Sequence, residues 1–319
     1  MRISEIAAHL GARLLGEDGE VSSCAPIFKA GQKDLSLLAW PKDIRLAKRT
    51  RIGALLISTD WAADYADEIP SSLLVIDNLT EAFKRLFMLQ RQGFFARQSS
   101  ITEASIHASA RVSSQAYVGH AHVGAQSIIS PGAIISDDVV IGSNCHISSG
   151  VFIASGTRLG DNNFVGANSV IGSDAFAPFE DQVLCSLGNV EVKNNVRIGA
   201  LCTIDRALLG STLIHNNCLL DNHVHVGHDA ELGEKVVIAA QTGLAGFVQI
   251  GEGATLGGQV GVAPHVVIGA HARVSAKTFV HKALGPYEIC SGNPGLAHEQ
   301  YLSVYKKNTK TKSRKLSYE

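Results

Sequence analysis

The segment IISPGAIISDDVVIGSNCHISSGVFIASGTRLGDNNFVGANSVIG, residues 128–172, decides the fold of this chain. An aliphatic residue stands at every sixth position of this segment, from Ile129 to Ile171. After an interruption the same repeat runs over residues 192–204 and then over residues 214–280. Helices repeat at 3.6 residues and strands alternate with a period of two, so a strict period of six fits neither a helix bundle nor a sandwich.

The period of six predicts a triangular prism built from short parallel strands. Three strands close one coil of 18 residues, and each strand sends one aliphatic side chain into the centre. Neighbouring coils then lie ~4.8 Å apart, the spacing of paired strands. The predicted inward residues are Ile129, Ile135, Ile141, Ile147, Ile153, Leu159, Val165, Ile171, Val192, Ile198, Ile204, Ile214, Leu220, Val226, Leu232, Ile238, Leu244, Ile250, Leu256, Val262, Ile268, Val274 and Val280. We therefore expect a mainly β chain, with a parallel β-helix over residues 99–284 that needs a cap at each end.

Residues 1–98 lack this repeat and predict a small α/β domain. A first helix is expected to begin with Ser4 as its N-cap, because apolar residues follow at helical spacing. The runs GALLIST, residues 53–59, and SLLVID, residues 72–77, suit buried strands. The segment LTEAFKRLFMLQRQ, residues 79–92, has one apolar face and predicts a further helix.

Composition limits the classes of protein to be considered. The chain has 319 residues, of which 45% are hydrophobic and 18% charged, which is typical of a globular protein. A net charge of −1 argues against nucleic acid as a partner. The six cysteines form no CxxC pair, which favours reduced thiols in a cytoplasmic protein. No apolar run is long enough to span a membrane, and the amphipathic N-terminus is unlike a signal peptide.

The histidine-rich stretch LLDNHVHVGHDAELGE, residues 219–234, is the candidate for chemistry. Residues 18 positions apart stack in such a prism, so the imidazole of His228 is expected beside the backbone of Gly246. A base and an N–H group placed in this way can flank a carbonyl carbon, one removing a proton and the other holding the oxyanion. Either Asp229 or Asp221 would orient the imidazole, as the carboxylate does in a catalytic triad.

A metal site is the competing interpretation of these histidines. His223 and His228 have the spacing with which γ-class carbonic anhydrases bind zinc, the third nitrogen coming from a neighbouring subunit. Those enzymes lack an N-terminal α/β domain, so we expect no metal here. A non-enzymatic scaffold is the other alternative, which the stacking of His228 with Gly246 disfavours.

Over nearly its whole length the chain resembles the LpxD family, the UDP-3-O-(3-hydroxyacyl)glucosamine N-acyltransferases of lipid A biosynthesis. The stretches IGALCTIDRALLGST, residues 198–212, and LLDNHVHVGHD, residues 219–229, carry this resemblance. It implies a left-handed β-helix with His228 as general base, Gly246 as oxyanion donor and His265 as an auxiliary histidine. It also implies a homotrimer that needs no cofactor, with acyl carrier protein as the acyl donor and a UDP-amino sugar as the acceptor.

The uridine-binding segment departs from the pattern of that family. In the stretch SLLAWPKD, residues 36–43, Leu37 and Asp43 stand where the family has aromatic residues. The indole of Trp40 therefore either replaces the missing base-stacking rings or packs in the domain core. The departure leaves open another nucleotide-linked amino sugar as acceptor and coenzyme A as donor. The predicted substrate-binding residues are Trp40, Lys42, Asp174, Phe176 and Asn222.

The resemblance places an acyl channel near the end of the prism. Phe279, flanked by Thr278 and His281, would close this channel and set the chain length, unless it only caps the last coil. Residues 285–319 are expected to form a partly helical C-terminal extension.

The extension ends in a basic tail, YKKNTKTKSRK, residues 305–315, which carries six Lys or Arg residues and no acid. This tail is either a solvated terminus or a landing patch for an acidic carrier protein. Any contact with the lipid product would be peripheral.

Overall fold

The structure is a computed structural model that describes residues 1–38, 41–91, 103–179, 182–183 and 186–313. The chain divides into two compact units. The first, here the N-terminal unit, comprises Met1–Ser100, Asp174–Asn189 and Arg206–Ser211, and the second, the prism unit, comprises Ile101–Ser173, Val190–Asp205 and Thr212–Glu319. Two short segments of the first unit thus fall inside the range predicted for the β-helix, and the division at residues 98 and 284 remains a prediction.

The N-terminal unit contains a five-stranded sheet in the order β1-β5-β4-β3-β2. β1 pairs antiparallel with β5 and the other pairs are parallel. Its strands are β1 (Arg13–Leu15), β2 (Ser23–Cys24), β3 (Asp34–Leu37), β4 (Ala54–Ser58) and β5 (Ser72–Ile76). Its helices are α1 (Ile3–Leu10), the 3-10 turn η1 (Pro41–Asp43), α2 (Ile44–Ala47), α3 (Thr59–Tyr65), the 3-10 turn η2 (Ala66–Glu68) and α4 (Leu79–Arg91). The two predicted strands and the predicted second helix are therefore present.

The expected start of the first helix is wrong by two residues. α1 begins at Ile3 with Arg2 as its N-cap, and Ser4 lies inside the first turn. The amide of Ser4 donates to Asp18 Oδ1 at 2.9 Å and its hydroxyl donates to Asp18 Oδ2 at 2.8 Å. A side chain 14 residues away thus does the capping that the local sequence assigned to Ser4.

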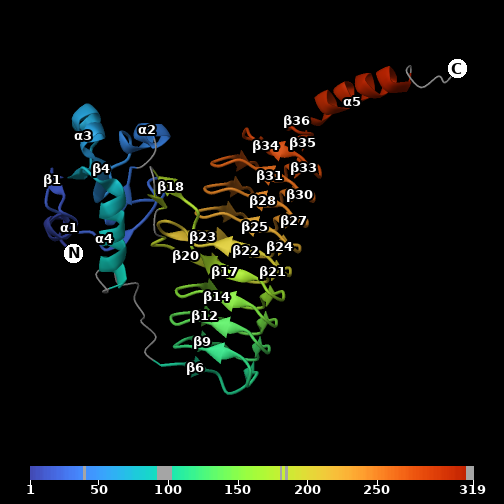
Figure 1. Ribbon diagram of the computed structural model, residues 1–319, viewed down its shortest axis with the longest axis horizontal. Coiled ribbons are helices and arrows are strands. Elements are labelled where there is room, and N and C mark those ends of the chain that lie inside the picture. The colour runs from blue at the N-terminus through green and yellow to red at the C-terminus, as the bar shows by residue number, and fades with distance from the viewer. Residues whose placement is uncertain (39–40, 92–102, 180–181, 184–185, 314–319) are drawn as a thin grey trace. The chain divides into compact units, whose positions relative to one another are not determined.

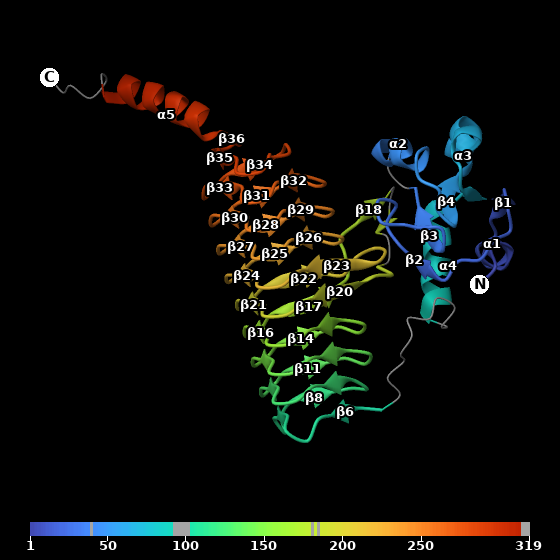
Figure 2. The same cartoon turned by 180° about the vertical axis from the view of Figure 1, so that it is seen from behind.

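The prism unit is the predicted parallel β-helix, with three stacks of short strands (Figures 1 and 2). Face 1 consists of β6 (Ser105–Ile106), β9 (His122–Val123), β12 (Val140–Ile141), β15 (Arg158–Leu159), β20 (Asn189–Val192), β23 (Ser211–Ile214), β26 (Glu231–Leu232), β29 (Gln249–Ile250) and β32 (Val267–Ile268). Face 2 consists of β7 (Arg111–Val112), β10 (Ile128–Ile129), β13 (His146–Ile147), β16 (Phe164–Val165), β21 (Arg197–Ile198), β24 (Leu219–Leu220), β27 (Val237–Ile238), β30 (Thr255–Leu256), β33 (Arg273–Val274), β35 (Ile289–Ser291) and β36 (Leu296–Ala297). Face 3 consists of β8 (Tyr117–Val118), β11 (Ile134–Ile135), β14 (Phe152–Ile153), β17 (Val170–Ser173), β22 (Thr203–Asp205), β25 (His225–Val226), β28 (Gly243–Leu244), β31 (Gly261–Val262) and β34 (Phe279–Val280).

The aliphatic repeat builds the core of this prism. All the predicted inward residues are buried in one hydrophobic cluster. Removing these side chains from water is the main stabilising term, on the order of 25 cal/mol for each Å² of apolar surface. At the corners the third residue after an inward aliphatic often adopts a left-handed backbone, as Asn144 does with φ 56° and Asn168 with φ 58°. Asn and Asp tolerate this conformation better than other residues with side chains, which explains their frequency beside the aliphatics.

Both interruptions of the repeat occur at the corner where face 3 leads to face 1. The chain leaves the prism after β17 and re-enters at β20, and one coil later it leaves after β22 and re-enters at β23. The longer excursion contains the antiparallel hairpin of β18 (Pro178–Phe179) and β19 (Gln182–Val183). In the next coil the same corner carries His228, which follows β25. The insertions thus mark the corner at which the candidate chemistry lies.

The chain ends with the antiparallel pair β35 and β36 and with helix α5 (His298–Ser313). This confirms the partly helical C-terminal extension. Among the described residues, no helix combines the length and the apolar character that crossing a bilayer requires.

Candidate active site

His228 and Asp229 form a buried pair at the corner between faces 3 and 1. The side chain of His228 follows β25 and is largely buried, the residue being 9% exposed. Its Nδ1 lies 3.0 Å from Asp229 Oδ2. The amide of Asp229 donates to the hydroxyl of Thr212 at 2.9 Å, which fixes the carboxylate-bearing residue to the preceding coil. The imidazole is therefore anchored through Nδ1, and Nε2 has no hydrogen bond within the described part of the chain.

Gly246 lies against the second nitrogen of this imidazole, as the stacking of coils predicts. A Cβ atom built on Gly246 would stand 2.5 Å from His228 Nε2. Within the described residues, no acceptor receives a hydrogen bond from the N–H of Gly246. The residue in the same place one coil later is Pro264, whose side chain offers no acceptor. The imidazole Nε2 thus lies against the backbone of Gly246, whose N–H has no acceptor among the described residues.

His265 lies one coil further, and a phenyl ring connects it to His228. The ring of Phe247 meets the His228 ring edge to face, with centroids 5.0 Å apart and an interplanar angle of 85°. The same ring stacks on His265, with centroids 4.5 Å apart and an angle of 8°. Phe247 was not among the predicted residues, although it follows Asp229 by one 18-residue coil and this register could have indicated it.

Of the two aspartates left open by the sequence, the structure brings only Asp229 to His228. Asp221 instead accepts a hydrogen bond from the amide of Asn222 at 2.7 Å. The side chain of Asn222 accepts from the amide of Ala200, one coil earlier, at 2.8 Å. Asp161 does the same for the amide of Ser143. Asn222 therefore closes a corner of the prism, and its predicted contact with substrate would have to use its remaining amide protons.

Face 3 carries a second polar network, whose residues the sequence did not indicate. The hydroxyl of Thr203 lies 2.8 Å from His225 Nδ1. Asp205 accepts from the hydroxyl of Ser173 at 2.7 Å and lies 3.8 Å from His225 Nε2. Thr203 and Asp205 belong to TIDR, residues 203–206, within one of the two stretches that carry the resemblance to the LpxD family. These residues form a polar network beside the corner that carries His228.

An unobstructed strip of backbone leads from His225 to Phe279 on the outer side of face 3. The register pairs His225 with Gly243, Gly243 with Gly261 and Gly261 with Phe279. A Cβ on Gly243 would meet nothing within 4 Å, so side chains leave this part of the face uncovered. Phe279 is 42% exposed at the end of the strip and stacks on His281 with centroids 5.8 Å apart. We call the backbone of Gly243 and Gly261 the glycine strip.

Thr278 does not share this surface. It is 1% exposed, and its hydroxyl accepts from the amide of Gly292 at 3.1 Å. Thr278 therefore ties the last coil to the C-terminal turn, and the structure separates it from Phe279 and His281.

The predicted substrate-binding residues of the N-terminal unit are only partly described. Trp40 and the side chain of Lys42 lie outside the described part of the chain. Phe176 is 76% exposed on the longer excursion. Asp174, on the same excursion, lies 3.8 Å from Nε of Arg206. Burial lowers the pKa of the Arg206 guanidinium, and Asp174 opposes this shift.

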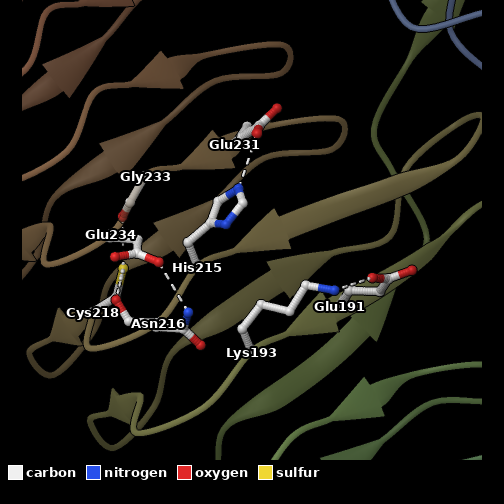
Figure 3. Close-up of polar contacts among 8 residues, drawn as sticks. All are labelled: Glu191, Lys193, His215, Asn216, Cys218, Glu231, Gly233 and Glu234. Carbon is white, nitrogen blue, oxygen red and sulfur yellow. Dashed lines mark hydrogen bonds and ion pairs between the residues drawn. The ribbon is translucent and has the colours of Figure 1, made fainter.

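A further polar cluster lies on face 1 and at the corner where face 1 leads to face 2 (Figure 3). His215 Nε2 lies 3.0 Å from Glu231 Oε1 there. Lys193 Nζ donates to Glu191 at 2.9 Å, in strand β20 of the same face. These side chains pair with one another, and we assign them no part in the chemistry.

The described residues give no cluster of three or more His, Cys, Asp or Glu side chains that could hold a metal ion. His223, which the metal interpretation needs, is exposed at the corner between faces 2 and 3. Within one chain it therefore occupies a different corner from His228.

The repeat matches a known family model. The model is described as bacterial transferase hexapeptide (six repeats), and it matches residues 120–155, 138–173 and 211–246. The third range includes both His228 and Gly246.

Similar curated proteins cover both units. The UDP-3-O-acylglucosamine N-acyltransferase of Campylobacter lari is 35% identical over 313 residues, which is 96% of this chain and 97% of that protein. The protein of the same name from Nitratidesulfovibrio vulgaris is 42% identical over 262 residues, which is 78% of this chain and 74% of that protein.

A solved structure shares the fold. The UDP-N-acetylglucosamine acyltransferase from Campylobacter jejuni superposes with a TM-score of 0.50 at 24% identity, over 61% of this chain and 74% of that one. At this level of identity the likeness concerns the fold alone.

Proposed function

The chain belongs to the family of UDP-3-O-acylglucosamine N-acyltransferases, and we propose that its corner site moves a 3-hydroxyacyl chain from acyl carrier protein to the 2-amino group of a UDP-3-O-acylglucosamine. This reaction is a step of lipid A biosynthesis. The enzyme is an acyltransferase, and the proposal concerns its donor, its acceptor and the residues that act.

One observation carries the assignment of residues: His228 faces Gly246 through Nε2 while Asp229 holds Nδ1. A carboxylate at Nδ1 favours the tautomer with its proton on that nitrogen, which leaves the lone pair on Nε2. This is the arrangement that a general base requires.

The proposed reaction is a direct displacement at the thioester. The amine nitrogen attacks the thioester carbonyl while His228 Nε2 removes one of its protons, and an N–C bond forms. The carbonyl oxygen becomes an oxyanion, to which the N–H of Gly246 donates. The C–S bond then breaks, and the imidazolium returns the proton to the leaving thiolate. The thioester is already activated, so the step needs no cofactor.

We propose that the acyl chain binds along the glycine strip. It begins beside His225 and ends at Phe279, so a hydrocarbon chain bound there would start near the reacting carbonyl and stop at an aromatic ring. Each buried methylene group stabilises binding by ~0.8 kcal/mol.

The test of the function is product analysis with the His228→Ala variant. Mass spectrometry should detect transfer from acylated carrier protein to UDP-3-O-acylglucosamine by the parent enzyme. The variant should turn over ~10²–10⁴ times more slowly, the usual contribution of a positioned base. His223→Ala, in the same segment but at another corner, is the matched control and should keep the parent rate. Loss of activity in His223→Ala and retention in His228→Ala would reject the assignment.

The zinc alternative is tested with the same assay. Treatment with a strong chelator should leave the rate unchanged, and elemental analysis of the purified enzyme should find no stoichiometric zinc. Inactivation by the chelator, reversed by added zinc, would favour a zinc enzyme instead.

We further propose a homotrimer. Leu219, 46% exposed, and Val237, 38% exposed, are register neighbours on face 2. Packing of neighbouring prisms in a closed threefold ring would cover such aliphatic side chains. Light scattering coupled to size exclusion should give three times the chain mass.

We also propose acyl carrier protein as the donor and the cytoplasm as the compartment of the reaction. An acidic carrier protein would meet the basic tail, of which the structure describes the backbone only as far as Ser313, and the reaction would take place in the cytoplasm. Offering acyl carrier protein and acyl coenzyme A in competition distinguishes the two donors.

Another nucleotide-linked amino sugar is a second candidate for the acceptor, because the uridine-binding segment departs from the pattern of the family. Leu37, which stands where the family has an aromatic residue, is buried in the N-terminal unit and cannot stack on a base. A panel of UDP-amino sugars, with product masses as the readout, tests whether another sugar is preferred.

A further inference from the structure

Phe247 stands between the two histidines of the corner site. Its ring touches His228 edge to face and His265 face to face, with centroid distances of 5.0 Å and 4.5 Å. The amide of Phe247 donates to the carbonyl of His228 at 2.9 Å, and the amide of His265 donates to the carbonyl of Gly246 at 3.1 Å. Backbone and ring contacts therefore join three successive coils at one point.

The backbone of Phe247 is an unusual place for a large ring. Its φ is 62°, in the left-handed region that L-residues with bulky side chains avoid. Asp229 and His265 occupy the same corner position one coil before and one coil after, with φ values of 57° and 62°. Most described corner residues with such φ values are Asn, Asp, Gln, His, Lys or Gly, whereas Phe247, Leu201 and Tyr287 carry large apolar or aromatic side chains.

The ring gives His228 a restraint that its hydrogen bond does not supply. The contact between Nδ1 and Asp229 fixes one atom of the imidazole, and the ring can still tilt about that contact. An edge-to-face neighbour at 5.0 Å is within the range that aromatic pairs prefer, and it limits this tilt. The position of Nε2 above Gly246 then follows from two contacts rather than one.

We propose that Phe247 is a positioning residue for acyl transfer: its ring holds the His228 imidazole toward Gly246 and keeps His265 stacked beside the reacting centre. This proposal rests on the proposed function, because it assumes that His228 is the base. Phe247 touches no reacting atom, so it acts through the two histidines.

The test compares three substitutions of Phe247. Phe247→Leu keeps apolar bulk at a left-handed position but removes the aromatic ring. Phe247→Asn removes the ring and places a residue that the left-handed backbone accepts, so it should fold even if Phe247→Leu does not. Phe247→Tyr keeps the ring.

We expect Phe247→Leu and Phe247→Asn to lower kcat ~10–100-fold, because a misplacement of about 1 Å can cost ~100-fold in rate. KM for both substrates should stay within about twofold, since the ring is not assigned to binding. Phe247→Tyr should restore most of the turnover. The matched control is Leu201→Asn, which makes the same kind of change at a left-handed residue of another corner and should leave kcat unaltered.

A readout without acyl transfer separates this proposal from the proposed function. Carbethoxylation by diethyl pyrocarbonate, followed by peptide mass mapping, reports how open each imidazole is. The rates at His228 and His265 should rise about fivefold or more in Phe247→Leu and Phe247→Asn, while the exposed His223 serves as internal reference. Failure of the parent enzyme to transfer acyl chains would reject the proposed function, and this mapping would still test the ring. Parent-like kcat and parent-like carbethoxylation in Phe247→Asn would overturn the role of Phe247.

Discussion

The imidazole of His228 and the backbone of Gly246 face each other across adjacent coils, so closely that a Cβ on Gly246 would stand 2.5 Å from Nε2 and 2.6 Å from Cε1. Carbon and nitrogen atoms that are not bonded do not approach to this distance, and a close-packed prism has little room to yield. Either the imidazole turns away or the coil shifts. In both cases His228 Nε2 leaves its observed position beside the backbone of Gly246.

Gly246→Ala should therefore lower kcat ~100-fold or more while the protein remains folded. The measurement is steady-state kinetics beside thermal unfolding. Gly258→Ala is the control, because Gly258 has the same place at another corner, where a Cβ would meet the carbonyl oxygen of Ala240 at 3.3 Å and would require a shift of only a few tenths of an ångström. A Gly246→Ala enzyme with the parent kcat would show that the imidazole does not act from its observed position.

Asp229 and Asp221 can be distinguished by the same amide substitution. Asp229→Asn removes the charge next to His228 Nδ1, and Asn accepts the left-handed backbone, φ 57°, that Asp229 adopts. We expect kcat to fall ~10²–10⁴-fold, because an amide that donates to Nδ1 selects the wrong tautomer. Asp221→Asn should change kcat less than about twofold, since the Asp221 carboxylate accepts only from the amide of Asn222 among the described hydrogen bonds. Reversed effects would assign the orienting role to Asp221.

The fold was predictable because one rule governs most of the chain. An aliphatic residue every six positions specifies three faces and a common core, and each predicted inward residue is buried. The contact between His228 and Gly246 follows from the same rule, since it is set by a spacing of 18 residues. The local sequence predicts the wrong start for the first helix, because a distant side chain is involved. The Asp18 carboxylate accepts from the amide of Ser4 in the first turn, and Ser4 is not the N-cap.

The details of the site depend on side-chain direction, which the period of six does not specify. The sequence places Asp229 next to His228, but only the corner geometry shows that Asp229, and not Asp221, contacts the imidazole. Phe247 shares a column with Asp229, and only the structure shows that its ring lies between two histidines. Thr278 neighbours Phe279 in sequence but turns inward, because successive residues of a strand point to opposite sides.

Phe279 should set the longest acyl chain that the enzyme accepts. Phe279→Ala removes the ring at the end of the glycine strip, so donors longer by a few methylenes should become substrates, each added methylene contributing ~0.8 kcal/mol. Turnover with short donors should change little. The measurement is the relative kcat/KM for a series of acyl carrier proteins with graded chain lengths.

The complementary change is Gly261→Val. An isopropyl group on the strip would stand next to the Phe279 ring, which a Cβ on Gly261 already approaches at 3.7 Å. The preferred chain should then become shorter. If Phe279 only caps the last coil, Phe279→Ala would lower the melting temperature and leave the chain-length profile as it was.

The buried thiol of Cys218 should make the stability of the prism depend on pH in the alkaline range. The thiol is buried and donates to the carbonyl of Gly233 at 3.1 Å (Figure 3). Burial raises the pKa of Cys218 to about 11. Between about pH 9 and pH 11 the unfolded chain therefore releases this proton while the folded chain retains it. Stability is thus complete below about pH 9, and the free energy of unfolding should fall by on the order of 2 kcal/mol as the pH rises to about 11.

Cys218→Ser should remove this part of the alkaline loss. Serine keeps the hydrogen bond, as Ser127 shows by donating to the carbonyl of Gly142 at 2.8 Å from the same position of an earlier coil. A hydroxyl does not titrate in this range, so folded and unfolded states would bind equal numbers of protons at residue 218. Urea unfolding at several values between about pH 8 and pH 11 measures the difference. The variant should lose less stability than the parent, although Cys145, Cys202 and Cys290, whose pKa values burial also raises, still contribute. Identical losses in the two proteins would mean that the Cys218 thiol ionises at the same pH whether the chain is folded or not.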